Sequence, residues 1–230
     1  QPCRTWSIPL SKTTHTDVSN EVKGLMSRTY LLGIDIGTQG TKTVLFDLNG
    51  KTVASAFETS ELLYPAEGAV EQRAEDIYGS VIRTVKDVME ASGIDPYEVA
   101  AIGMDGQMAS ILGIDRDFRA ITPLDNWLDT RCEPYIKQMK KIAEDELIRM
   151  TGCPVTYAHG PKVLRWKTEY RDVYNRIDKF VEPVTYVVGR LCGLTGEQAY
   201  IDYTNIHFSG FADNEKLCWS EELCKLFDVD

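Results

Sequence analysis

The chain has 230 residues, of which 43% are hydrophobic and 26% are charged, and its formal net charge is −10. This length and composition are sufficient for one large or two small globular domains. The negative charge disfavours nucleic acid and anionic membrane surfaces as partners, and no apolar run reaches the roughly 20 residues of a membrane span.

Residues 1–28 differ from the rest of the chain. Their segment SKTTHTDVSNEVKG is polar and has neither a helical nor a strand period, so we expect an N-terminal extension without a catalytic role. No apolar stretch of a secretory signal is present there. The six cysteines form no C-x-x-C pair, which favours free thiols and a cytoplasmic location.

The next region is predicted to alternate strands with one helix. The apolar patterns predict strands at residues 30–35, 41–48, 51–59, 99–104 and 110–114, with a hairpin turn at Asn49 and Gly50. A helix over residues 74–93 ends at Gly93. Its apolar face carries Ile77, Val81, Val85, Val88 and Met89. A polar break at residues 105–107 separates the last two strands.

The second half is predicted to be mainly helical, with helices at residues 132–150, 161–170, 184–192 and 220–227. Strands followed by a helix and further strands indicate an α/β fold, in which a mixed β-sheet is flanked by helices. No linker is evident inside residues 29–230, which we therefore treat as one domain.

The segment GIDIGTQGTK, from Gly33 to Lys42, joins two predicted strands through a glycine-rich turn. It lacks the G-x-x-x-x-G-K-[ST] spacing of the P-loop. A dinucleotide-binding turn is also excluded, because that motif is followed by a helix and TKTVLFDL predicts a strand.

A strand–turn–strand phosphate site remains. Glycines allow close approach of the backbone to an anion, and successive N–H groups in a tight turn can bind it. The residues expected to face phosphate are Gly37, Thr38, Gln39, Thr41 and Lys42. Asp35 would repel phosphate unless Mg²⁺ lay between them, and one carboxylate is a plausible anchor for this ion. The alternative is a hairpin in which Asp35 caps the turn amides.

Several segments together resemble the FGGY carbohydrate kinases of the actin-like ATPase superfamily, and among them most closely the xylulokinases. The first phosphate motif of that family is similar to GIDIGTQGTK. The other similar segments are GMDGQM (residues 103–108), WLDTRC (127–132), YAHGPKVLRW (157–166), IDYTN (201–205) and WSEELCKLFDVD (219–230). They occur in the family's order over about residues 30–230.

This resemblance implies a ribonuclease-H-like domain that binds ATP in a cleft shared with a second domain. It also implies ATP and Mg²⁺ as cofactors, Asp35 at the metal, and transfer of the γ-phosphoryl group to a hydroxyl of a small sugar, expected to be a ketopentose such as xylulose. The implied substrate-binding residues are Gln107, Met108, Ala109, Trp127, Asp129, Arg131 and Tyr157. A homodimer is left open.

Each of these assignments has a structural alternative. Gln107 can be a turn amide, and Asp129 with Arg131 can form an ion pair at a helix start. Tyr157 can be a packing residue. Lys162, which stands where the family has a lysine, can be a solvated side chain.

The chain also departs from the family pattern. Ala109 stands where xylulokinases have a histidine, and Arg165 stands where the family has a tryptophan, with Trp166 one residue later. The family's catalytic base and adenine-binding motifs are not found in these residues, so we expect them in a C-terminal domain that is absent from this chain. The alternative to a kinase is a non-catalytic nucleotide- or sugar-binding module of actin-like fold.

Overall fold

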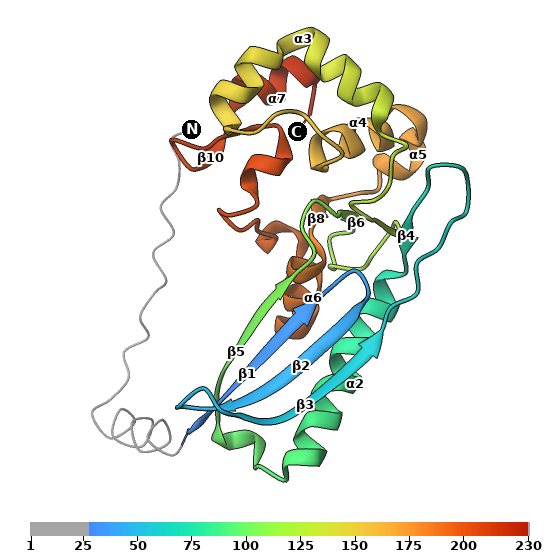
Figure 1. Ribbon diagram of the computed structural model, residues 1–230. Helices are drawn as coiled ribbons and strands as arrows, with labels where there is room; N and C mark the ends of the chain where they lie inside the picture. The colour runs from blue at the N-terminus through green and yellow to red at the C-terminus, as the bar shows by residue number, and fades with distance from the viewer. Residues whose placement is uncertain (1–27, 230) are drawn as a thin grey trace.

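Alternating apolar residues and tight turns make the first three strands a meander. The computed structural model describes residues 28–229, so nearly all of the predicted extension at 1–28 lies outside it. The strands β1 (Tyr30–Ile36), β2 (Gly40–Asp47) and β3 (Thr52–Thr59) are antiparallel neighbours. β5 (Val99–Gly106) then pairs parallel with β1, which gives the order β3-β2-β1-β5 (Figure 1).

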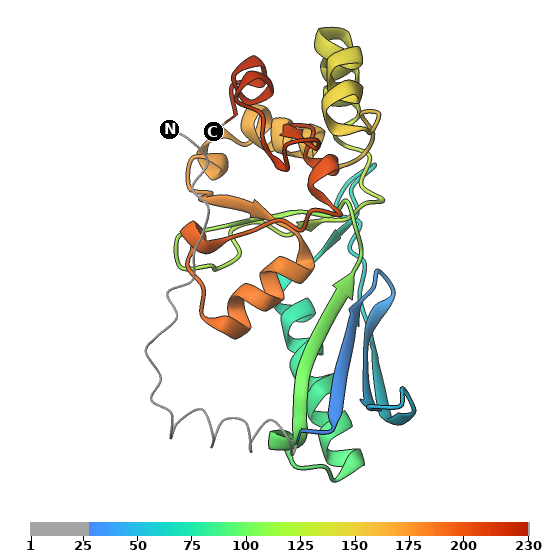
Figure 2. The same ribbon diagram turned by 90° about the vertical axis from the view of Figure 1, so that its left-hand side faces the viewer.

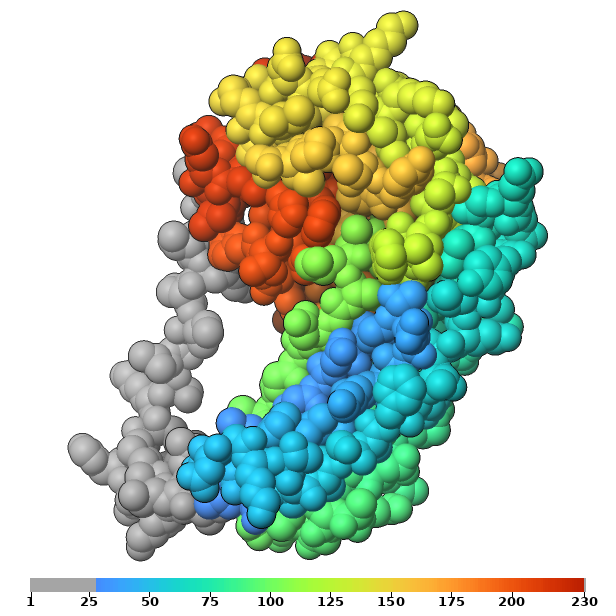
Figure 3. All heavy atoms as spheres, in the orientation of Figure 1, coloured from blue at the N-terminus to red at the C-terminus, as the bar shows by residue number. Residues whose placement is uncertain are grey.

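One face of this sheet is covered by two helices, α2 (Ala74–Ser92) and α6 (Pro183–Cys192) (Figure 2). α2 ends where Gly93 adopts the left-handed conformation that glycine favours. The opposite face, formed by β1 to β3, is open in the space-filling view (Figure 3). Between sheet and helices lies a core that includes Leu32, Ile34, Leu45, Ile77, Val81, Tyr186 and Val187.

A helical layer lies beyond the carboxyl ends of β1 and β5 (Figure 1). It contains α3 (Glu133–Thr151), α4 (His159–Glu169), α5 (Arg171–Tyr174) and α7 (Glu221–Phe227). α3 is kinked at Ala143, whose backbone dihedrals are not helical. These helices enclose a second core, which includes Ile136, Met139, Leu147, Leu164, Phe211 and Phe227.

Three pairs of short strands in the described residues lie outside the main sheet. They pair as β4 (Glu71–Gln72) with β7 (Leu124–Asp125), β6 (Leu112–Ile114) with β8 (Lys179–Val181), and β9 (Ala212–Asp213) with β10 (Cys218–Trp219). Single 3₁₀ turns complete the structure as η1 (Pro96–Glu98), η2 (Gly196–Gln198) and η3 (Ile206–Ser209). Among residues 28–229, no helix is both long enough and apolar enough to cross a bilayer.

The expected α/β architecture with a mixed sheet is confirmed, and each predicted element of five or more residues is present, the strand at 110–114 in shortened form. The polar break predicted at 105–107 is wrong at its start, because Asp105 and Gly106 continue β5. α5 and most of the two- and three-residue strands were not predicted, since segments this short carry no readable hydrophobic period.

Two glycines of the sheet give a testable contrast. A Cβ on Gly40 would lie 2.3 Å from the carbonyl oxygen of Glu58 and 2.4 Å from the ring of Phe57, whereas a Cβ on Gly103 would meet nothing within 4 Å. We expect Gly40→Ala to lower the free energy of unfolding by about 1–3 kcal/mol, the usual cost of overpacking. Gly103→Ala is expected to be neutral or slightly stabilising. Urea denaturation of the two variants measures the difference, and equal stabilities would contradict it.

Candidate functional site

The glycine-rich turn lies where β1 ends, beside the helical layer. The Gly37 amide donates to the carbonyl oxygen of Gly40 at 3.0 Å, and the Gln39 carbonyl accepts from Ser60 N–H at 3.0 Å. β1 and β2 are antiparallel on either side. The prediction that Thr38 and Gln39 occupy a tight turn between two strands is therefore confirmed, and no helix begins there.

The side chains of this turn divide into outward and inward groups. Gln39 and Lys42 are exposed, and Thr38 is half-buried. Thr41 is fully buried, and its hydroxyl lies 2.7 Å from the hydroxyl of Ser80 in α2. The predicted role of Thr41 as a side-chain donor to phosphate is therefore corrected. In this arrangement its side chain binds the sheet to α2, because β2 alternates its side chains between the two faces.

Asp35 has an acidic neighbour that the sequence analysis did not assign. Asp35 pairs with Asp105 across the parallel β1–β5 ladder and with Lys42 across the antiparallel β1–β2 ladder. Paired residues place their side chains on one face of a sheet, and both aspartates are exposed. Two neighbouring carboxylates suit Mg²⁺, which keeps several waters and takes few protein ligands. Within residues 28–229, no group of three or more acidic, histidine or cysteine side chains is arranged so that it could hold a metal ion.

Gln107 is the centre of a network of side-chain amides. Its Oε1 accepts from Asn126 Nδ2 at 2.7 Å and from Ser110 Oγ at 3.1 Å. Its Nε2 donates to Gln72 Oε1 at 2.8 Å, and Asn126 also donates to Gln72 at 3.0 Å. The network binds the end of β5 to the last residue of β4 and to the residue that follows β7. Gln107 therefore has a structural role, and its predicted contact with substrate stays a prediction.

Trp127 connects this network to the glycine-rich turn. Its indole N–H donates to the Thr38 hydroxyl at 2.8 Å, and its backbone N–H donates to Ser110 Oγ at 2.9 Å. Trp127 as a whole remains 46% exposed. A segment predicted to contact sugar and a turn predicted to contact phosphate are thus joined by one direct side-chain hydrogen bond.

Asp129 and Arg131 form the ion pair that the sequence analysis left open as the alternative. The Asp129 carboxylate is fully buried, accepts from Val70 N–H at 2.9 Å, and lies 2.7 Å from the Arg131 guanidinium. Arg131 also binds Glu71 and Asp125. Burial acts to lower the pKa of Arg131, but hydrogen bonds to Asp129 and Glu71 outweigh it and raise that pKa. The pair stabilises the loop, and neither carboxylate oxygen of Asp129 faces open space.

Lys162 is buried, so the interpretation of a solvated lysine is wrong. Its Nζ lies 2.8 Å from the Ala109 carbonyl, 2.7 Å from the Asn126 carbonyl and 3.4 Å from the Asp125 carbonyl. Ala109 has a positive φ of 60°, which is uncommon for a residue with a Cβ. One amine therefore joins three segments that are far apart in sequence, and it holds Ala109 in an unfavourable backbone conformation.

Burial lowers the pKa of Lys162 to about 8 from the ordinary value of 10.5. Between those two values the unfolded chain binds more protons than the folded chain, so this group makes stability rise with pH. We expect the free energy of unfolding of the wild type, minus that of Lys162→Met, to rise from pH 8 to 10.5. The rise is at most about 1.4 kcal/mol per pH unit. Chemical denaturation at several pH values measures it. A difference that is constant over this range would mean that the amine titrates normally.

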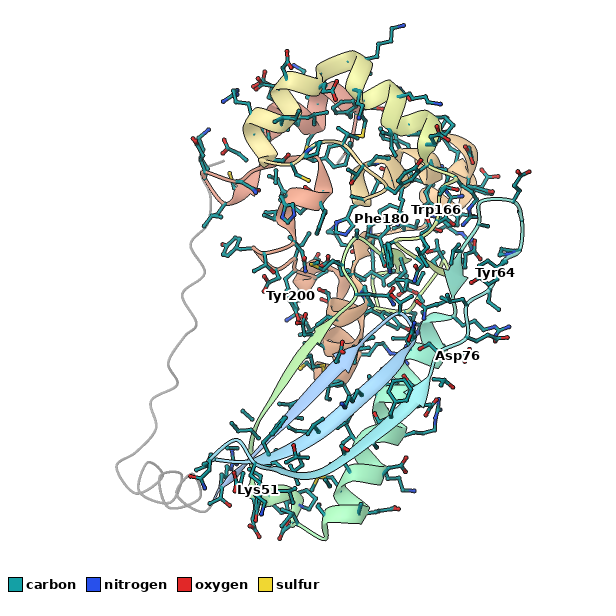
Figure 4. The ribbon with its side chains drawn as sticks, in the orientation of Figure 1. Lys51, Tyr64, Asp76, Trp166, Phe180 and Tyr200 are labelled. Atoms are coloured by element: carbon teal, nitrogen blue, oxygen red, sulfur yellow. The ribbon has the colours of Figure 1, made fainter. Side chains whose placement is uncertain are left out.

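A second buried cation lies beside Lys162. Arg165 donates to Asp125 Oδ2 at 2.7 Å, the Trp166 indole donates to the same oxygen at 2.6 Å, and Arg131 binds Oδ1 at 3.1 Å. Asp125 and Arg165 are both fully buried. Figure 4 shows Trp166 in the helical layer beyond one end of the sheet, whereas Lys51 marks the opposite end. The cluster anchors α4 to the segment that carries Trp127.

Three of the residues that the resemblance assigns to substrate binding, Gln107, Asp129 and Tyr157, do not line the same groove. A groove of about 690 Å³ runs along β5 and α6, and Asp105 and Gln107 border it, but neither Asp129 nor Tyr157 does. Tyr157 and Met108 are nevertheless exposed, by 38% and 54%. The buried side chain of Lys162 instead brings together the backbone of three segments, at residues 109, 125–126 and 162.

Several residues of this site were missed in the sequence. Gln72, Asn126, Asp125 and Asp105 each lie at the end of a strand, where polar residues often belong to a site. Asp105 carried a readable signal, because it follows an apolar strand just as Asp35 does. Gln72 carried none, since its partners lie 35 and 54 residues away.

Comparisons with known proteins identify relatives of this chain. Residues 30–230 match the family described as "FGGY family of carbohydrate kinases, N-terminal domain". The gluconokinase of Bacillus subtilis is 28% identical over 202 residues, which cover 87% of this chain and 38% of that protein. The glycerol kinase of Azorhizobium caulinodans is 31% identical over 217 residues, with coverage of 87% and 42%.

A solved structure shows the same fold. The ligand-bound xylulose kinase from Lactobacillus acidophilus superposes with a TM-score of 0.78 and 28% identity, over 87% of this chain and 40% of that one. The chain thus spans about two fifths of the length of the relatives that it matches. Xylulose, gluconate and glycerol kinases all occur among them, so similarity alone does not select a substrate.

Proposed function

This chain belongs to the FGGY family of carbohydrate kinases. We propose that it supplies one wall of the active site of an ATP-dependent carbohydrate kinase, and that this wall binds both the phosphates of ATP and the sugar. The observation that carries the proposal is the Trp127–Thr38 hydrogen bond. It places the segment that resembles a sugar-binding motif against the turn that resembles a phosphate-binding motif. Phosphoryl transfer depends mostly on such positioning of the two reactants and on stabilisation of charge.

The phosphate side of the wall is the turn from Gly37 to Gly40 with Lys42 beside it. Its glycines permit close approach of the backbone to a triphosphate, and the Lys42 ammonium supplies a positive charge. Asp35 and Asp105 would hold Mg²⁺, which neutralises charge on the phosphates when it is bound. We assign no general base among residues 28–229.

The sugar side is formed by Met108, Trp127 and Tyr157, which are exposed and lie in the three segments joined by Lys162. Aromatic walls suit the apolar face of a polyol, and fixed polar groups set its orientation. The buried ion pair of Asp129 and Arg131 stabilises the loop that carries Trp127, through contacts with Val70 and Glu71. A cytoplasmic location and a homodimer belong to the proposal and rest on family membership alone.

We further propose a ketopentose such as xylulose as the substrate. The segment GMDGQM, whose ending GQM resembles xylulokinases, supports this choice, and the relatives include xylulose kinases. The test is a coupled ADP-release assay on the product of the complete reading frame, here called the complete protein, with D-xylulose, D-ribulose, D-gluconate and glycerol. The highest kcat/KM is expected with a ketopentose. A higher value with gluconate or glycerol would overturn the substrate and leave the kinase assignment intact.

A further inference from the structure

The hydroxyl of Thr38 lies between the two halves of the proposed wall. It accepts from the Trp127 indole N–H at 2.8 Å and donates toward Gln107 Oε1 at 3.4 Å. A hydroxyl has one proton to donate and two lone pairs to accept with. The two bonds therefore use its only proton and leave one lone pair.

The hydrogen bond that the Thr38 hydroxyl donates is weak. Gln107 Oε1 already accepts shorter bonds from Asn126 and Ser110, at 2.7 and 3.1 Å. At 3.4 Å the contact from Thr38 is the longest of the three and the weakest by distance. A phosphate oxygen near the turn would be a stronger acceptor, because hydrogen bonds to charged groups are about twice as strong as neutral ones.

A hydroxyl that donates to an anion becomes a better acceptor, since hydrogen bonds in a chain polarise one another. The bond from Trp127 to Thr38 would then strengthen when phosphate binds. That bond and the backbone bond to Ser110 hold a residue that is otherwise half exposed. Fixing the indole before the sugar arrives removes part of the entropy cost of ordering the sugar site.

We propose that Thr38 is a positioning residue that couples the two substrates, so that nucleotide bound at the turn raises the affinity for sugar through Trp127. This inference rests on the proposed function and adds a direction of coupling to it. By linkage, sugar raises the affinity for nucleotide by the same factor. Coupling energies between sites typically correspond to 5-fold or more, and one hydrogen bond places the expected factor near that lower end.

The test measures sugar affinity by titration calorimetry of the complete protein, with and without a non-hydrolysable ATP analogue and Mg²⁺. D-xylulose, D-gluconate and glycerol are the probes. We expect an affinity gain of about 5-fold in the wild type and in Thr38→Ser, which keeps the hydroxyl. The gain should vanish in Thr38→Val and in Trp127→Phe, and the double variant should lose no more than either single one, because both remove the same bond.

A second readout needs no sugar. The analogue alone should change the tryptophan fluorescence of the complete protein. The contribution of Trp127 is the part of the change that is lost in Trp127→Phe, and this part should also disappear in Thr38→Val. Coupling that persists in Thr38→Val, or persistence there of this part of the fluorescence change, overturns the inference while sugar binding still supports the proposed function. Absence of binding by all three polyols overturns both.

Discussion

Replacing Asp125 with asparagine is expected to lower the free energy of unfolding by about 3–5 kcal/mol, the usual cost of removing one partner from a buried ion pair. The carboxylate neutralises the fully buried guanidinium of Arg165 at 2.7 Å and accepts from the Trp166 indole on the same oxygen. An asparagine has similar volume but no charge, so Arg165 would be left as an unpaired cation in the interior.

Asp117→Asn is the matched control for this prediction. Asp117 forms an ion pair with Arg119 at 3.1 Å, but both side chains are more than half exposed. Such pairs contribute at most about 1 kcal/mol. Urea denaturation of both variants in the complete protein provides the comparison. Similar small losses for the two would contradict this prediction, because they would show that Arg165 does not need the charge of Asp125.

Asp35→Asn is expected to lower kcat by about 10²–10³-fold, the range seen when one group that stabilises developing charge is removed. Asp35 is exposed at the end of β1 and lies beside Asp105, so the substitution removes one of two proposed carboxylates for Mg²⁺. Because the side chain is exposed, stability should change little.

Steady-state assays over a range of Mg²⁺ concentrations test this role of Asp35. The variant should need more Mg²⁺ to reach half of its own maximal rate, and Asp117→Asn should behave as the wild type. An unchanged kcat and an unchanged Mg²⁺ requirement in Asp35→Asn would remove this residue from the metal site.

The main sheet was predictable from the sequence because its strands carry clear local signals. Apolar alternation along Tyr30–Ile36, the Asn49-Gly50 turn and the stop at Gly93 each act over a few residues. The turn at Thr38 and Gln39 was predictable for the same reason, since strand patterns lie on both sides of it.

The site could be predicted by segment but only partly by side chain. The role of Thr41 depends on the alternation of side chains along β2, which turns its hydroxyl toward Ser80. The role of Lys162 depends on its burial. The local sequence does not distinguish a lysine that donates to three carbonyls from a solvated one. Asp125 was missed because its partners Arg165 and Trp166 come from a helix about 40 residues later. These contacts depend on how the helical layer packs on the sheet, and no periodic pattern encodes that packing.

We propose that a phosphoryl group passes from ATP to a polyol along the wall that this chain forms. The most direct measurement follows the label from [γ-³²P]ATP in the complete protein with D-xylulose, D-gluconate or glycerol. Label is expected on the polyol in the wild type, and its transfer is expected to be about 10²–10³-fold slower in Asp35→Asn. Label that appears only as inorganic phosphate, or polyol and nucleotide that bind without any transfer, would contradict this proposal.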